Sequence, residues 1–82
     1  MARILYFGKL SDVTGSLSEE LPLPAGIADT EALRGWLDTE RGFGGALLHK
    51  SIRLAVNGDI TAGPAPVSDT DEIALMPPVG GG

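Results

Sequence analysis

Few side chains of this 82-residue chain could do chemistry. The sequence has no cysteine, which removes thiolate nucleophiles, disulfides and zinc–thiolate sites, and its only histidine is His49. A histidine-based metal cluster is therefore excluded, and no metal site is expected. The serines have no histidine–acid pair at a recognisable spacing, so nothing predicts a hydrolase. His49 is predicted to have a surface or helix-end role.

Two short motifs suggest a ligand but lack the residues to hold one. Residues 42–45 read GFGG without the lysine and serine or threonine that follow a phosphate-binding loop, so they are interpreted as a helix stop. Residues 69–72 read DTDE and lack the length and ligand series of a calcium loop. A solvated turn is predicted there, and no bound cofactor is expected at either motif.

The remaining reactive group is the end of the chain, MPPVGGG. Two prolines hold the backbone extended, and six extended residues reach about 20 Å. Glycines, which lack Cβ atoms, suit a channel too narrow for side chains, so the tail is predicted to deliver the α-carboxylate of Gly82 into a partner. A flexible tail with no role is the alternative. The predicted tail consists of Pro77, Pro78, Val79, Gly80, Gly81 and Gly82, after a domain of residues 1–76.

Hydrophobic patterns predict the elements that position this tail. Strands are expected at 2–7, 16–23, 52–56 and 72–76, with Leu17, Glu19, Leu21 and Leu23 on one side of the second. Helical turns are expected at 8–15, a main helix capped by Asp29 or Thr30 at 29–40, and a hairpin turn at Asn57-Gly58. This order suits an α+β fold, the β-grasp or ubiquitin-like layout: a mixed sheet of four to five strands, the first and last central, with the main helix across one face.

The other face of the sheet is predicted to be apolar as well. Its outward positions include Leu5, Phe7, Ala55, Ala74 and Met76, with Ile60 just past the hairpin turn. An exposed apolar patch on a small acidic domain is typical of a protein interface. Two alternatives remain: the face assignment is one residue out, or the loop 61–71 covers the patch. If the patch is exposed, it docks the domain and docking places the tail.

Charge and hydropathy limit the partners. The net charge is −5 and the six cations are scattered, which argues against nucleic acid. No apolar stretch approaches the roughly 18 residues of a membrane span, and the first residues do not read as a signal peptide, so no membrane association and a cytoplasmic location are expected.

The sequence resembles the small subunit of molybdopterin synthase, the MoaD family of ubiquitin-like sulfur carriers. The likeness runs through RILYFGKLSDVTG, TEALRGWL, LAVNGDI and DTDEIALMPPV to the terminal Gly81-Gly82. Two positions depart from the family pattern. Thr70 stands where the family usually has glycine, in DGDE, and Gly80 stands where serine, threonine or alanine is common.

The resemblance implies a cytoplasmic role in molybdenum cofactor biosynthesis, in a heterotetrameric synthase. An E1-like, MoeB-like enzyme uses ATP to adenylate the Gly82 carboxylate, and sulfur then replaces AMP to give a thiocarboxylate. The tail enters a MoaE-like large subunit, which carries the catalytic groups, and sulfur passes to cyclic pyranopterin monophosphate. Phe7, Ile60 and Met76 match positions that contact partners. The alternatives are a sulfur carrier for thiamine or tRNA thiolation, or a ubiquitin-like interaction module that is never activated.

Overall fold

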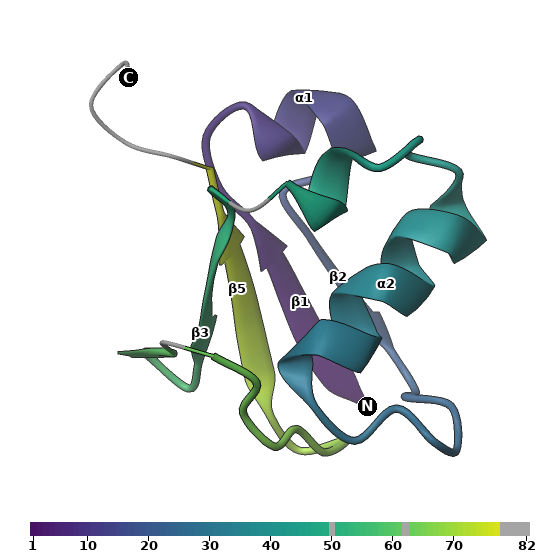
Figure 1. Cartoon of the computed structure of the whole chain (residues 1–82), viewed down its shortest axis with the longest axis vertical. Coiled ribbons are helices and arrows are strands. Elements are labelled where there is room, and N and C mark those ends of the chain that lie inside the picture. Colours follow the sequence, from purple (N-terminus) through teal and green to yellow (C-terminus); the bar gives the residue numbers. More distant parts are fainter. Residues whose placement is uncertain (50, 62, 78–82) are drawn as a thin grey trace.

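The fold is a mixed five-stranded sheet with one long helix packed across one face (Figure 1). The computed structural model describes residues 1–49, 51–61 and 63–77. The elements in chain order are β1 (Ala2–Tyr6), α1 (Leu10–Thr14), β2 (Ser18–Leu21), α2 (Thr30–Arg41), the 3₁₀ turn η1 (Ala46–Leu48), β3 (Arg53–Val56), β4 (Asp59–Ile60) and β5 (Glu72–Met76). The predicted β-grasp layout is confirmed.

The first and last strands lie side by side in the interior of the sheet. The strand order is β2-β1-β5-β3-β4, with β1 and β5 parallel and the other pairs antiparallel. This agrees with their composition, because strands flanked on both sides and covered by a helix need apolar side chains. The predicted edge strand, β2, is at one edge.

The core fills the space between the sheet and α2. Leu33 and Leu37 of α2 are fully buried, one turn apart on the face towards the sheet. Ile4 and Tyr6 of β1 and the β5 side chains Ile73 and Leu75 are at most 1% exposed. Burial of each such side chain contributes on the order of 2 kcal/mol, so this cluster supplies much of the stability of the domain.

Both ends of α2 are set by residues that the sequence singles out. The Asp29 side chain accepts a hydrogen bond from the Ala32 backbone N–H at 2.8 Å, which caps the first turn. Gly42 follows the last turn with a left-handed φ of 70°, so the GFGG segment is a helix stop as predicted. The buried Asp38 carboxylate then accepts from Gly45 N at 2.8 Å and Leu47 N at 3.0 Å, which anchors η1 to α2.

The second strand is shorter than predicted, and Leu17 and Leu23 lie outside it. Leu17 precedes β2 and its side chain is 75% exposed, although its carbonyl accepts a hydrogen bond from Tyr6 N at 2.9 Å. The backbone continues the pairing while the side chain stays at the edge of the sheet. Leu21 is buried and Leu23 packs against the core.

Glu19 occupies an inward position of β2 because it has two partners there. The buried Tyr6 hydroxyl donates to Glu19 Oε2 at 2.7 Å, and Arg41 at the end of α2 pairs with Glu19 Oε1. Burial, reinforced by the hydrogen bond to Glu19, raises the pKa of Tyr6 well above its usual value. The phenol therefore stays protonated and links β1, β2 and α2.

No helix in the described part of the chain combines the length and apolar composition that crossing a membrane requires.

Candidate docking face and tail base

The face of the sheet opposite α2 carries a row of apolar side chains across four strands. Leu5 is paired in register with Ala74, Ala74 with Ala55, and Ala55 with Ile60. Because side chains alternate along a strand, these four point away from α2, while their neighbours Ile4, Tyr6, Ile73 and Leu75 point into the core. The predicted face assignment is correct, without a one-residue slip.

The residues of this face differ widely in exposure. Phe7 is 47% exposed and Ile60 63%, whereas Leu5 and Met76 are half-buried. Ala74 is only 8% exposed and Ala55 6%; both have short side chains on interior strands, and each has one larger register neighbour, Leu5 for Ala74 and Ile60 for Ala55. Ala74 therefore lies on the predicted face but offers little surface to a partner, and Phe7 and Ile60 offer the most. We call Leu5, Phe7, Ile60, Ala74 and Met76 the docking face.

The described part of the loop 61–71 packs elsewhere. Thr30 N donates to the carbonyl of Ala65 at 2.9 Å, and Val67 N donates to the carbonyl of Ala28 at 3.0 Å. Thr30 is the first residue of α2 and Ala28 lies two residues before it, and Val67 is buried in the core. These bonds hold the segment beside α2, so the alternative that it covers the docking face finds no support in the described residues.

The base of the tail leaves the sheet beside Phe7. The Phe7 N–H donates to the carbonyl of Leu75 at 3.1 Å, which brings the end of β1 next to the end of β5. Pro77 follows Met76 and lies against Gly8, so closely that a Cβ on Gly8 would be 2.9 Å from Pro77 Cγ. Pro78, Val79, Gly80, Gly81 and Gly82 lie outside the described residues, and the predictions for them stay predictions.

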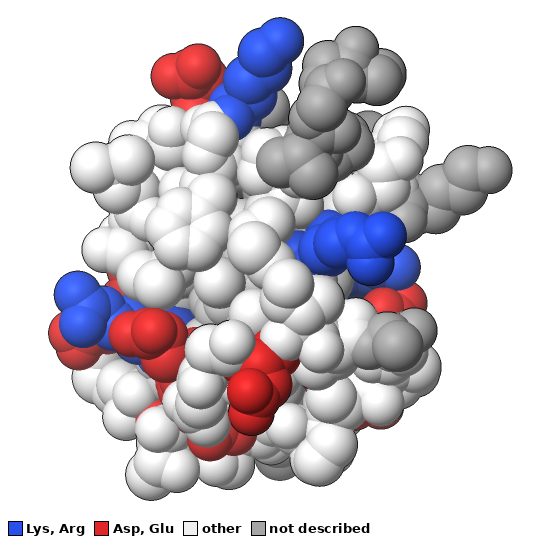
Figure 2. All heavy atoms as spheres, turned by 90° about the vertical axis from the view of Figure 1, so that its left-hand side faces the viewer, with Lys and Arg blue, Asp and Glu red and all other residues white. Residues whose placement is uncertain are grey.

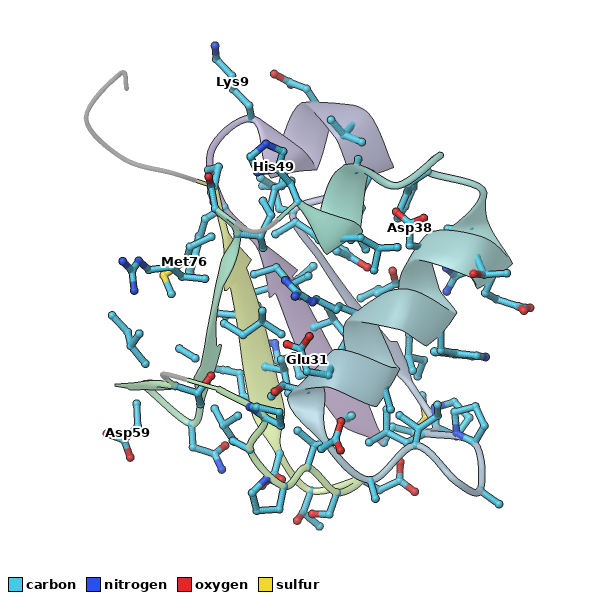
Figure 3. The ribbon with its side chains drawn as sticks, in the orientation of Figure 1. Lys9, Glu31, Asp38, His49, Asp59 and Met76 are labelled. Carbon is cyan, nitrogen blue, oxygen red and sulfur yellow. The ribbon has the colours of Figure 1, made fainter. Side chains whose placement is uncertain are left out.

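The docking face is bordered by charges that the sequence analysis did not single out. Arg53 is exposed and paired in register with Met76, and Lys9 is exposed one residue after Gly8. Figure 2 shows this side of the molecule as a broad uncharged area with basic groups at its margins and most acidic groups below it. In Figure 3, Met76 projects from the side of the sheet opposite α2, and Lys9 lies beyond the end of β5. Alternation along β3 could have placed Arg53 on the same face as Ala55.

Comparison with known proteins identifies the family. The profile of the ThiS family matches residues 4–82, which is nearly the whole chain. The chain belongs to the ThiS family. This is a family of ubiquitin-like sulfur carriers, whose members typically pair with a catalytic partner and an E1-like enzyme. The resemblance seen in the sequence is confirmed at this level.

Solved structures similar to this ThiS-family chain share its fold over at least 95% of each chain. Small archaeal modifier protein 1 from Haloferax volcanii is 24% identical with a TM-score of 0.78, covering 99% of this chain and 98% of that one. The protein of the same name from Methanosarcina acetivorans is 21% identical with a TM-score of 0.71, at 99% and 95% coverage. A putative molybdopterin converting factor, subunit 1, from Pyrococcus furiosus is 20% identical with a TM-score of 0.67, at 95% and 97% coverage. At these identities the likeness establishes the β-grasp fold.

The DTDE turn of this ThiS-family chain holds β5 in place without glycine at position 70. Ser68 N donates to Asp71 Oδ2 at 2.8 Å, and Asn57 Nδ2 donates to Asp71 Oδ1 at 2.9 Å. The Asn57 side-chain oxygen accepts from Glu72 N at 2.9 Å, so the hairpin turn is tied to the start of β5. Among the described non-glycine residues only Asn57 has a positive φ, of 51°. Thr70 therefore needs no left-handed conformation.

Acid should remove the contribution of this turn to stability. The hydrogen bonds from Asn57, and then from Ser68, lower the pKa of Asp71. A depressed pKa in the folded state stabilises the fold above the unfolded-state value of about 3.9 and is lost as pH falls through the lower folded value. We expect Asp71→Asn to lower the Tm at pH 7, and the gap to the unmodified protein to close below about pH 4. Asp59→Asn, at an exposed position of β4, is the control. A gap that stays constant with pH would contradict this account.

Proposed function

We propose that this protein is the sulfur carrier of molybdopterin synthase. On this proposal, the Gly82 α-carboxylate is adenylated, becomes a thiocarboxylate, and donates its sulfur to cyclic pyranopterin monophosphate in a large subunit. The observation that carries the proposal is the ThiS-family match, which runs from residue 4 through the terminal Gly81-Gly82. The DEIALMPPV segment before this end adds the likeness to molybdopterin synthase small subunits in particular.

The chemistry suits a chain without thiols. A carboxylate is a poor electrophile, so one of its oxygens must first attack the α-phosphate of ATP, which releases pyrophosphate and leaves an acyl-adenylate. Sulfur at the sulfide oxidation level then adds to the acyl carbon and expels AMP. The resulting thiocarboxylate is a nucleophile that needs no cysteine, and the chain has none. ATP is bound by the adenylating enzyme, and the acid–base groups for sulfur transfer belong to the large subunit.

The described residues support the delivery of such a tail. Phe7 and Ile60 give the domain an exposed apolar surface, and Pro77 leaves the sheet beside Phe7, against Gly8. A rigid proline at this point limits the directions that the following residues can take, which reduces the entropy lost when the tail enters a partner. Docking of the face and insertion of the tail are then one event.

A second function is favoured by a specific comparison. The two small archaeal modifier proteins share the fold over at least 95% of each chain, and their name calls them modifiers. On this alternative, the adenylated Gly82 carboxylate is transferred to a lysine amine of another protein. In a third alternative, the thiocarboxylate formed at Gly82 donates its sulfur to tRNA. An interaction module that is never activated is the remaining alternative.

Intact-mass measurement separates these functions. The chain ending at Gly82 is incubated with an E1-like adenylating enzyme, ATP and a sulfur donor, and we expect the mass to rise by the difference between sulfur and oxygen. The thiocarboxylate form is then offered to the large subunit with cyclic pyranopterin monophosphate, and molybdopterin is expected to form. If the mass does not change, an interaction module that is never activated explains the protein better. A mass change without molybdopterin, but with thiolated tRNA or conjugated protein, would favour the corresponding alternative.

A further inference from the structure

Two of the described cations have no carboxylate partner within the described part of the chain. Arg3, Arg34 and Arg41 each have a nitrogen within 4.0 Å of a glutamate oxygen. Lys9 and Arg53 form no such pair there, and Asp12, the carboxylate nearest to Lys9 along the sequence, makes no ion pair with it. Both cations are exposed. They can therefore pair with charges on another protein without giving up an internal partner.

These two cations both lie near the tail base. Arg53 neighbours Met76 across the β3–β5 pair, and Lys9 follows Gly8, which contacts Pro77. Lys9 and Arg53 therefore border the end of the docking face where the chain leaves the sheet, and Figure 3 shows Lys9 beyond that end of β5.

The opposite end of the same face is acidic. Glu20 and Glu72 are the register partners of Arg3, and Arg3 is already paired with Glu72 at 4.0 Å. Asp71 precedes Glu72, and the Asp71 carboxylate accepts hydrogen bonds from two neutral groups, the Asn57 side chain and the Ser68 backbone N–H. The face thus has a basic end at the tail and an acidic end away from it, although the whole chain carries a net charge of −5.

Such a charge distribution orients an encounter. An acidic surface attracts the end with Lys9 and Arg53 and repels the rest of a negatively charged domain, so the tail is presented first. A basic surface would instead attract the acidic end and turn the tail away. The tail base therefore matches a partner whose charges around the tail channel are negative.

We propose that the adenylating enzyme presents acidic side chains beside the channel that takes the tail, where they pair with Lys9 and Arg53. The inference rests on the proposed function only through adenylation, the step that every activated alternative shares. It is independent of which acceptor later receives the sulfur. The docking face supplies apolar contact, and the two cations set the orientation and the association rate.

The test compares charge reversals at the two ends of the face. Association of the adenylating enzyme from the same source with the unmodified chain, Lys9→Glu, Arg53→Glu and Arg3→Glu is followed by stopped-flow at low and high salt. All three variants change the net charge equally, and Arg3→Glu is the control at the far end. We expect the association rate constant at low salt to fall about tenfold for Lys9→Glu and Arg53→Glu and less than about twofold for Arg3→Glu. Added salt should slow the unmodified chain and narrow these differences.

The outcomes separate the two proposals. Equal association rate constants for the three variants, or faster association of the unmodified chain with added salt, would overturn the proposal that acidic side chains line the rim of the channel. Carrier-dependent exchange of pyrophosphate into ATP is measured in parallel with the unmodified chain. If that exchange is absent, the proposed function fails together with the inference, whereas exchange with equal association rates removes the inference alone. Thermal unfolding of each variant verifies that the exposed substitutions leave the domain folded.

Discussion

Deletion of Gly82 is expected to abolish thiocarboxylate formation and leave the domain folded. The sequence ends in three glycines, so the shortened chain still ends in Gly-Gly. The deletion therefore changes only the length of the tail. One extended residue spans about 3.5 Å. Because a misplacement of 1 Å at a reacting centre can cost about 100-fold in rate, a carboxylate withdrawn by a whole residue should lose at least that much. The measurement is intact mass after incubation with adenylating enzyme, ATP and sulfur donor.

The matched control for this deletion is Gly80→Ala. It keeps the length of the tail and the terminal Gly81-Gly82 pair and adds one methyl group, so near-normal thiocarboxylate formation is expected. The Tm of both variants should equal that of the unmodified chain, because the core consists of residues between Ala2 and Leu75. Normal molybdopterin formation by the shortened chain would end the sulfur-carrier proposal.

Phe7→Asp is expected to weaken binding to the large subunit far more than it weakens the fold. Phe7 is an aromatic side chain, 47% exposed, beside the point where the tail leaves the sheet. Aromatic residues at the centre of an interface typically contribute about 2 kcal/mol or more, so we expect the Kd to rise at least about 30-fold. The cost to folding should stay near 1 kcal/mol, since the side chain is only half covered. Kd is measured by calorimetry and stability by urea unfolding.

The control for Phe7→Asp is Leu48→Asp. Leu48 lies in η1, which packs against α2, and its side chain is 49% exposed, so the substitution introduces the same charge at a similar exposure away from the docking face. Binding should be nearly unchanged for this variant. If the two variants weaken binding equally, the change in net charge explains the effect, and Phe7 is not part of the interface.

Local signals were sufficient where one residue type has one physical role. Asn57-Gly58 forms the hairpin turn because both residues adopt positive φ, Asp29 caps α2 because its side chain reaches Ala32 N, and Gly42 ends the helix in a left-handed conformation. The apolar composition of β1 and β5 placed them in the interior of the sheet. These predictions needed no knowledge of distant residues.

Predictions that depend on neighbours in space were incomplete. The alternation of β5 predicts Ala74 in an exposed patch, but its short side chain lies between two paired strands and is only 8% exposed. Leu17 fits the alternation of its strand and is nevertheless exposed at the edge of the sheet. The placement of 65–67 beside the start of α2 follows from two long-range hydrogen bonds. In each case the pattern gives the direction of a side chain, while exposure depends on what another segment places over it.

The sequence by itself determined the elements, their caps and turns, and the two faces of each strand, and its lack of cysteine led to the proposal that a C-terminal carboxylate is the reactive group. These follow from local stereochemistry and from the inventory of residues. Only the tertiary structure decided that Phe7 and Ile60 are the open parts of the docking face, that Pro77 lies against Gly8, and that Lys9 and Arg53 both lie near the tail base. These residues come from separate segments, and strand register, which is set by core packing over the whole domain, brings them together.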